Sequence, residues 1–335
     1  GRLQVERDQQ LVEAEGLDLH LALAVTASRQ ASATLHSQAA ELRARRNGHK
    51  EILRGVELNG SIAIDGDTTS LALKRLALDE PGLEVSGKFE QVSGTPSASM
   101  DFSGRGIDVD ATRRVALALA GDVELVDKIF KYLRGGTVSQ INVRSQGRFA
   151  AELGELQNIR IEGKLQNGSV SIPEIELDLT ETFGDVLVAD GILQGTGMST
   201  RLEGSSAHDG SLKVGLADDT DLFQLELMLN ADLAQAGQIL RRIVVNPDFI
   251  DELNRITDLQ GTGTGKLVLG DSLENIQAKV DVSDLNFTAD HQRIPLPIKV
   301  TSGQVEFAEN LVNLRHWQGA VGDSQFTELS CQADL

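Results

Sequence analysis

The chain has 335 residues, of which 40% are hydrophobic but only 4% aromatic, so aliphatic side chains must supply most of any core. Fifty acidic residues against 31 basic ones give a formal net charge of −19, which repels nucleic-acid backbones and argues against nucleic acid as a partner. The single cysteine, Cys331, excludes an internal disulfide and an all-cysteine metal site, and we expect it to be a buried structural thiol.

The predicted elements begin with β-strands. Aliphatic residues from Leu17 to Val25 alternate with polar or small ones, which places them on one face of an extended strand. The segment 28–46 stays open between a helix, favoured by its alanines, and a strand, favoured by its serine and threonine alternation. Strand alternation recurs along the chain, as an antiparallel meander requires. Four pairs typical of hairpin turns separate many of these strands: Asp65-Gly66, Asn167-Gly168, Asp190-Gly191 and Asp209-Gly210.

Two segments have helical spacing instead. In the first, at 110–134, apolar residues recur at steps of three and four, Asp110 is the candidate N-cap, and Gly135-Gly136 marks the exit. The second, at 232–259, has a similar apolar face and is followed by Gly261. We therefore expect two amphipathic helices within a β-rich chain.

Both helices are predicted to break internally, at Gly121-Asp122 and at Asn246-Pro247, where a capping side chain restarts a shorter helix. Downstream, Ile172-Pro173 corresponds to Ile294-Pro295 at a nearly constant spacing. The chain therefore contains a predicted internal repeat. The predicted segments are 1–107, an incomplete N-terminal β repeat; 108–230, a repeat with its broken helix at 110–134 and then strands; and 231–335, a second repeat with its broken helix at 232–259 and then strands.

Local patterns that suggest chemistry have simpler explanations. The run Gly261–Lys266 resembles a phosphate loop, but it follows a helix, leads into a strand and is followed by Leu267, so we interpret it as a helix exit whose glycines allow close packing. A calcium loop at Asp65-Gly66-Asp67 would need a glutamate where Leu76 stands, which favours a hairpin turn. The histidines lack paired metal-ligand spacing, and no nucleophile elbow is present. We expect no enzymatic activity, cofactor or metal.

The longest apolar run, at 115–121, is far shorter than the ~20 residues that cross a bilayer, so we expect no transmembrane helix in this chain. Trp317 either caps a core or touches a membrane interface, and capping is the more common role. The first residues read like mid-strand sequence and the chain stops abruptly after Leu335, so we expect a piece of a longer protein.

The alternating aliphatic stripe is the remaining candidate site. If a long sheet curls with no second sheet opposite, the stripe lines a trough that suits acyl chains, because each buried methylene contributes about 0.8 kcal/mol. Alternation alone does not distinguish this trough from a dry core between two sheets. The candidate groove residues are Ile62, Ile64, Leu71, Leu73, Ile159, Ile161, Ile175, Leu177, Leu179, Val186, Val188, Leu267, Leu269, Val280, Val282, Ile298, Val300, Val305 and Phe307.

Two phrases, Gly168–Ile175 and Gly184–Leu193, reappear as Arg293–Ile298 and Gly303–Val312. In this order they resemble the AsmA-like superfamily of bacterial envelope proteins, with its YhdP and TamB branches, over roughly residues 55–335. The resemblance implies an inner-membrane anchor outside this chain, a body in the periplasm, and a long β groove that conducts phospholipids between membranes or supports outer-membrane assembly. It brings no catalytic residues.

We therefore predict a mainly β fold with a few helices, in which an elongated, curved antiparallel sheet built from repeats forms an apolar groove and each repeat has one broken helix. The predicted function is a periplasmic module that binds or conducts phospholipid acyl chains, with other envelope proteins as further partners. The main alternative is a non-catalytic envelope scaffold whose helices plug the groove. A secreted adhesin-like β array is a third possibility.

Overall fold

The computed structural model describes residues 1–7, 10–27, 30–46, 49–121, 123–217, 220–243, 246–272, 274, 276–308 and 311–334. These residues are mainly β, with antiparallel strands and four α-helices, which confirms the predicted fold class. They form two compact units. The first comprises residues 1–170 and 185–193, and the second comprises residues 171–184 and 194–335.

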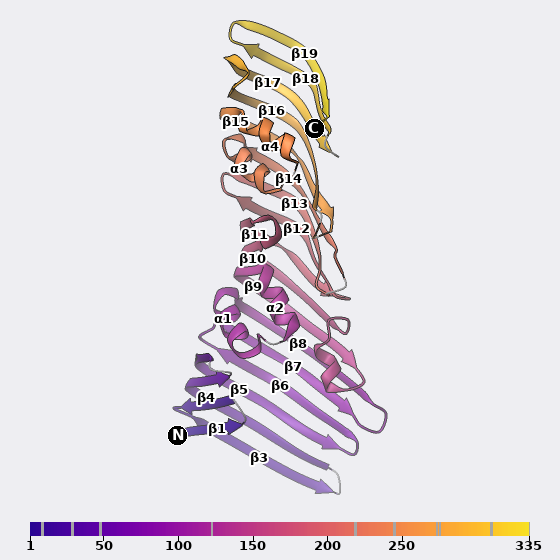
Figure 1. Ribbon diagram of the computed structural model, residues 1–335. Helices are drawn as coiled ribbons and strands as arrows, with labels where there is room; N and C mark the ends of the chain where they lie inside the picture. The colour runs from indigo at the N-terminus through magenta and orange to yellow at the C-terminus, as the bar shows by residue number, and fades with distance from the viewer. Residues whose placement is uncertain are drawn as a thin grey trace. The chain divides into compact units, whose positions relative to one another are not determined.

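In the first unit most strands pair with the next strand along the chain, as Figure 1 shows. The exception is β2, which pairs with β1 and with β4 instead of β3, so β4 pairs with β3 along its first part and with β2 along its second. The ambiguous segment 28–46 is thus a strand from Gln30 onward, and residues 28 and 29 lie outside the described part of the chain. The strands are β1 (Arg2–Arg7), β2 (Gln10–Glu15), β3 (Asp18–Ala27), β4 (Gln30–Arg46), β5 (His49–Asp65), β6 (Thr68–Leu78), β7 (Leu83–Val92), β8 (Ser97–Asp108), β9 (Leu133–Gly147) and β10 (Ile159–Ile172).

The first predicted helix is indeed broken, into α1 (Val109–Ala120) and α2 (Glu124–Tyr132). Its cap was wrongly predicted: Asp108, not Asp110, accepts the hydrogen bond from the Ala111 N–H, at 3.0 Å, because the strand ends one residue before the helix begins. The break at Gly121 is confirmed, but Asp122 lies outside the described residues, and the N-cap position of α2 is Val123, whose side chain makes no capping bond.

The exit of this helix also differs from the prediction. Strand β9 begins at Leu133, directly after Tyr132, so Gly135-Gly136 lies inside the strand. Gly136 has φ +108°, and a Cβ there would meet the backbone of Gly168 at 2.6 Å. Gly136 therefore serves close strand pairing with β10 rather than helix termination, and a Cβ at Gly135 would meet the Asp110 carboxylate at 2.7 Å.

Helix α1 lies across the sheet of the first unit. It contacts β4 and β5 on one side and β8 and β9 on the other, so this part of the sheet bends around the helix. The Arg46 guanidinium donates a hydrogen bond to the Leu119 carbonyl in the last turn of α1, and Arg114 forms an ion pair of 3.7 Å with Glu51. Both contacts hold α1 at the Arg46 end of β4 and the Glu51 end of β5.

The second unit is also an antiparallel arrangement with a broken helix, α3 (Leu233–Ile243) and α4 (Pro247–Asn254). The predicted cap is confirmed, since the Asn246 side chain accepts hydrogen bonds from the N–H groups of Asp248 and Phe249 at 2.9 and 3.0 Å. Strands β10, β11 and β12 contribute residues to both units. The strands are β11 (Leu177–Ala189), β12 (Ile192–Leu202), β13 (Ser205–Gly215), β14 (Phe223–Asp232), β15 (Ile256–Asp271), β16 (Ile276–His291), β17 (Ile294–Ala308), β18 (Leu311–Val321) and β19 (Ser324–Asp334).

The second helix is shorter than predicted. It ends at Asn254 rather than at residue 259, because β15 begins at Ile256, and Gly261 lies within that strand. Each helix pair leads almost directly into a long strand, β9 or β15, so the order of elements recurs as the sequence phrases do. The boundaries of the predicted repeats stay a prediction.

Two of the four predicted turn pairs are not turns. Asp65-Gly66 and Asp190-Gly191 do lie at the ends of adjacent strands, but Asn167-Gly168 lies inside β10 and Asp209-Gly210 inside β13. The strand register shifts at both of these places, and Asn167 and Asp209 have φ of 50° and 51°. They are β-bulges of a kind that places a residue in the left-handed backbone region, as a hairpin turn also does. Short 3-10 helices, Ala150–Gly154 and Pro173–Ile175, connect other strands.

Cys331 is exposed, so its prediction as a buried thiol was wrong. It lies on β19, which pairs with β18 and, among the described residues, with no other strand. Trp317 on β18 is half-buried: its indole N–H donates to the Gln304 carbonyl at 2.9 Å, and its ring meets Phe287 edge-on at 5.6 Å. This geometry agrees with a capping role.

Candidate functional site

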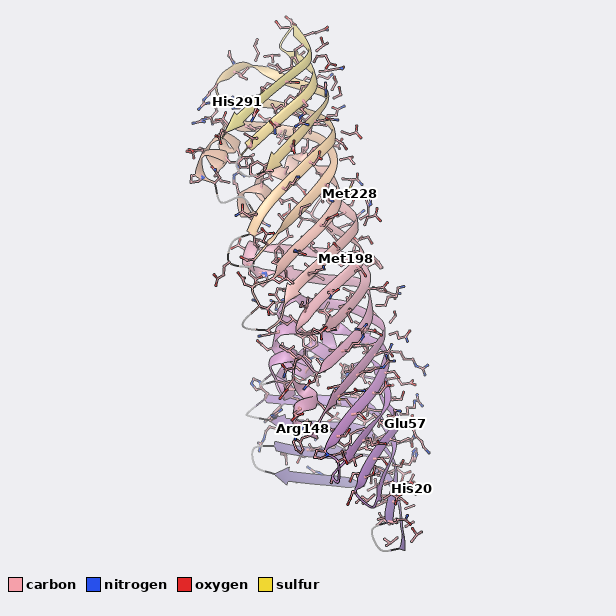
Figure 2. All side chains as sticks on the ribbon, turned by 90° about the vertical axis from the view of Figure 1, so that its right-hand side faces the viewer. His20, Glu57, Arg148, Met198, Met228 and His291 are labelled. Carbon is pink, nitrogen blue, oxygen red and sulfur yellow. The ribbon has the colours of Figure 1, made fainter. Side chains whose placement is uncertain are left out.

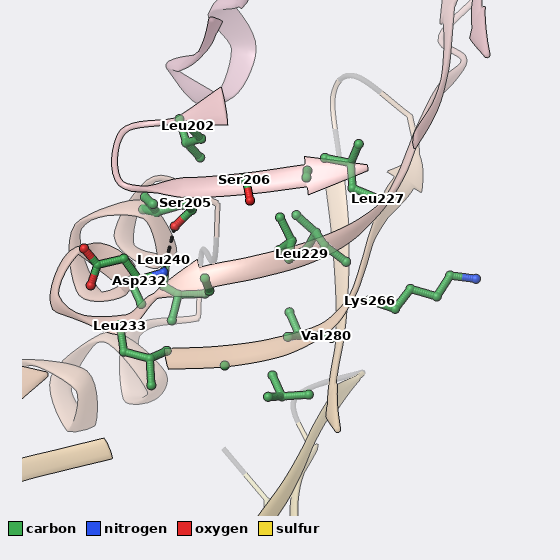
Figure 3. Close-up of a pocket in the computed structure, with 18 of the residues that line it drawn as sticks. Leu202, Ser205, Ser206, Leu227, Leu229, Asp232, Leu233, Leu240, Lys266 and Val280 are labelled. Carbon is green, nitrogen blue, oxygen red and sulfur yellow. Dashed lines mark hydrogen bonds between the residues drawn. The ribbon is translucent and has the colours of Figure 1, made fainter. Parts of the chain in front are cut away.

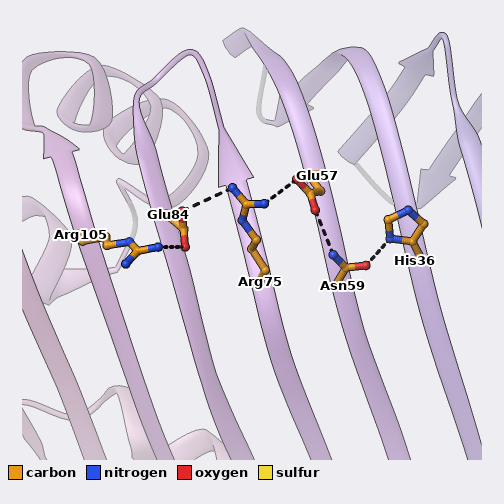
Figure 4. Close-up of polar contacts among 6 residues, drawn as sticks. All are labelled: His36, Glu57, Asn59, Arg75, Glu84 and Arg105. Atoms are coloured by element: carbon orange, nitrogen blue, oxygen red, sulfur yellow. Dashed lines mark hydrogen bonds and ion pairs between the residues drawn. The ribbon is translucent and has the colours of Figure 1, made fainter.

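The sheet of the first unit has one polar face. A chain of side-chain contacts crosses it from Arg105 to His36, including 2.9 Å between Arg75 and Glu57 and 3.0 Å between Asn59 and Glu57 (Figure 4). Figure 2 shows Glu57 and His20 on the side of this sheet away from its helices. Because side chains alternate between faces, the neighbouring residues of these strands point to the helix side.

On that helix side, an apolar row crosses six consecutive strands in register. Leu23 faces Ala33, Ala33 faces Ile62, and Ile62 faces Leu71. The row continues from Leu71 to Phe89 on β7 and then to Met100 on β8. Directly opposed side chains on one face of an antiparallel sheet touch one another, so the row is a continuous apolar strip.

Much of this strip is exposed. We define the open face as Leu21, Leu23, Val25, Ile62, Ile64 and Leu71, whose exposed fractions run from 38% at Leu71 to 80% at Val25. Helix α1 is held at Glu51, eleven residues from Ile62 on β5, which corresponds to roughly 35 Å at about 3.3 Å per residue. The helix therefore leaves this end of the strands uncovered. Clustered exposed aliphatics of this kind mark binding surfaces more often than scattered ones do.

In the second unit, the helix covers the sheet instead. Helix α3 contacts β14, β15 and β16, and beneath it lies a cavity of about 150 Å³ with an almost wholly apolar lining. The helix contributes Leu233, Ala236, Ile239 and Leu240, as Figure 3 shows in part. Strands supply the remaining apolar surface, including Leu177, Leu179, Leu202, Leu227, Leu229, Leu267, Val280 and Val282. We call this space the α3 cavity.

Polar groups at the rim of the α3 cavity fix the start of the helix. The Asp232 N–H donates to the Ser205 hydroxyl at 3.0 Å, and the Asp232 carboxylate accepts from the Ala234 N–H at 3.0 Å. The Gly204 N–H donates to the Gln235 side chain at 2.6 Å. Lys266, although its stem borders the cavity, points away from it and pairs with Glu226 at 2.6 Å.

Glycines of the run interpreted above as a helix exit form part of the cavity floor. Gly263 and Gly265 lie inside β15, several residues after the helix has ended, so the helix-exit interpretation was wrong in position. A Cβ at Gly263 would lie 3.7 Å from a Leu233 methyl and 3.3 Å from a Val282 methyl. The glycine thus leaves room between floor and helix, whereas a Cβ at Gly265 would clash with the Asp281 carbonyl oxygen on the paired strand, which is close packing of the predicted kind.

Helix α4 is attached by a cluster of charges and by an aromatic contact. Glu252 contacts His291 at 3.0 Å, Arg293 at 3.3 Å and Arg255, while Phe249 packs on Phe307 at 5.2 Å between ring centres. Desolvation by partial burial raises the pKa of Glu252, but the Arg255 hydrogen bond, the Arg293 charge and the His291 hydrogen bond outweigh it and hold the pKa below its usual value. Arg241 joins α3 to α4 through Asn254 at 2.9 Å.

The predicted groove residues are spread over several places. On the open face lie Ile62, Ile64 and Leu71, with the half-buried Leu73 beside them on β6. Around the α3 cavity lie Leu177, Leu179, Leu267, Val280 and Val282. Neither place includes Ile159, Ile161, Ile175, Val186, Val188, Leu269, Ile298, Val300, Val305 or Phe307, and Ile175 lies in a 3-10 helix rather than in a strand.

The prediction missed two groups of residues at these sites. Leu21, Leu23 and Val25 were recognised as a strand face but were not included as groove residues, although their strict alternation was the strongest in the chain. The α3 side chains Leu233, Ala236 and Leu240 were recognised only as an apolar helix face. That face was the available signal for the cavity, since it must cover something apolar.

Within the described ranges, no group of acidic, histidine or cysteine side chains has the arrangement of a metal site. No helix in the same part of the chain combines the length and apolar character needed to span a membrane. Comparisons with protein-family models, with curated proteins and with solved structures give no match to this chain.

Proposed function

We propose that this protein binds the acyl chains of phospholipids on the open face, as a periplasmic module that supports lipid transport or assembly of the outer membrane. The single observation that carries the proposal is the continuous apolar strip from Leu23 to Met100, exposed at its Leu23 end and backed by a polar face. An acyl chain laid across it buries methylenes at about 0.8 kcal/mol each without needing hydrogen-bond partners.

Three further features support this role. The strip crosses the strands, so a chain lying along it is met by one apolar side chain per strand. The opposite face satisfies its polar groups through the contacts of Arg75, Glu57 and their neighbours and stays in water. The likeness of the repeat phrases to AsmA-like proteins suggests the periplasmic location, an inner-membrane anchor in the full-length protein, and other envelope proteins as partners.

The test compares two aspartate substitutions on neighbouring residues of β6. Leu71→Asp places a charge on the open face, whereas Ala72→Asp places the same charge on the opposite face. Binding of phospholipid is measured by native mass spectrometry and by titration with a fluorescent phospholipid, with the fold checked by circular dichroism. We expect Leu71→Asp to weaken binding at least tenfold, a loss of about 1.4 kcal/mol, and Ala72→Asp to leave it unchanged.

A second candidate function is a non-catalytic envelope scaffold whose helices fill the groove. The observation that favours it is the position of α1, which contacts β4 and β5 as well as β8 and β9 and so occupies the bend of its sheet. If the unsubstituted protein and both variants are folded but none of them binds phospholipid, the lipid proposal is overturned and the scaffold is supported.

A further inference from the structure

The α3 cavity differs from the open face in being covered, small and separate. Its volume of about 150 Å³ is close to that of apolar cavities that stay dry and take up a molecule the size of benzene. A whole phospholipid does not fit such a space. A short stretch of hydrocarbon, of roughly six carbons as in benzene, does.

The lining also selects against a polar headgroup. Its charged members are Asp232 and Lys266, and each has its own contacts outside the cavity interior, with the helix start and with Glu226. The Ser205 hydroxyl accepts from the Asp232 N–H, and the Thr200 hydroxyl contacts Thr182 and the Thr180 carbonyl at 2.8 and 3.0 Å. A charged headgroup placed inside would lose its hydration without gaining a counter-charge, which costs several kcal/mol.

We propose that the α3 cavity binds the methyl end of a single hydrocarbon chain while the polar end of the same molecule stays outside. This inference rests on the proposed function for the class of ligand, but it concerns a different place and a different part of the lipid. Helix α3 acts as the cover: its apolar residues Leu233, Ala236 and Leu240 face the chain, and its ends are tied by Ser205 at the start and by Arg242, which donates to the Glu176 carbonyl at 3.4 Å.

The first experiment asks which end of a lipid reaches the cavity. Methyl-labelled protein is titrated with stearate that carries a nitroxide either near its methyl end or near its carboxylate, and the line broadening of the Leu177, Leu267 and Val282 methyls is recorded by NMR. We expect strong broadening from the label near the methyl end and little from the other. Equal broadening by both labels, or broadening by neither, overturns the proposal.

The second experiment fills the cavity. Ala236→Phe places a ring in the space under α3, and Ala234→Phe places the same ring on the exposed side of the helix as a matched control. We expect Ala236→Phe to abolish the broadening of the cavity methyls and Ala234→Phe to retain it. If Ala236→Phe does not fold, Gly263→Ala fills the floor with one methyl group and is expected to reduce the broadening.

The methyls of Ile62, Ile64 and Leu71 separate this proposal from the proposed function. If they broaden while the cavity methyls do not, the open face binds lipid and the cavity inference fails. If the cavity methyls alone broaden, and Leu71→Asp has no effect on lipid binding, the proposed function fails and the cavity remains.

Discussion

The two units use the same alternating sequence pattern with opposite results. In the first, Leu23 and Val25 are 72% and 80% exposed, whereas in the second Val214 and Phe223 are fully buried. Phe223 faces Val214 across one strand pair, and Leu225 faces Leu212 and Leu269, so this region is a dry core. Alternation thus specifies that a strand has an apolar face, and the surrounding structure specifies whether that face meets water or protein.

The largest expected effect tests this contrast through stability. Phe223→Ala should lower the free energy of unfolding by about 3–5 kcal/mol, because it removes a fully buried ring and leaves a cavity. The control, Leu23→Ala, should change it by less than about 0.5 kcal/mol, since its side chain is already in water. Urea unfolding followed by circular dichroism measures both, and comparable losses would mean that the open face is covered in solution.

A smaller effect contrasts the two helix breaks. Asn246→Ala removes the side-chain cap of α4 and should cost about 1 kcal/mol. Val123 occupies the same position before α2 with an extended backbone, φ −86° and ψ 115°, but without a capping bond. Val123→Asn should therefore stabilise the protein by up to a similar amount. Thermal unfolding of both variants measures whether their changes in stability have opposite signs. If both variants are less stable than the protein, the packing of the Val123 side chain contributes more than a cap does.

The smallest effect depends on pH. The pKa of Glu252 is lowered in the folded protein, so its contribution to stability is present above the unfolded value of about 4.3 and is lost as the pH falls through the folded value. The difference in unfolding free energy between the protein and Glu252→Gln should be present at pH 6 and shrink below pH ~4.5. It should be small, because the carboxylate is 38% exposed and solvent screens it. A difference that grows on acidification would contradict this sign.

Sequence reasoning identified many of the strands and both helix breaks, because these depend on local periodicity and on the capping residue at Asn246. It misplaced Asn167-Gly168 and Asp209-Gly210, since these bulges and a hairpin turn alike place a residue at positive φ, and only strand pairing distinguishes them. Five of the predicted groove residues meet at the α3 cavity, but Leu269 on the same strand as Leu267 lies in the dry core. Whether a residue lines the cavity or lies in the core depends on tertiary contacts between strands, and sequence periodicity carries no information on those contacts.

The pairing of strands with their sequence neighbours also determines how the protein can fold. Loops such as the one between β5 and β6 close over a few residues, so these contacts form with little loss of chain entropy and a low contact order. Strands β8 and β9 pair only after the chain has passed through α1 and α2, and β14 and β15 only after α3 and α4. Folding should therefore proceed in rapid blocks of hairpins, with its slower steps at the two helix pairs, and the blocks can form one after another as the chain is synthesised.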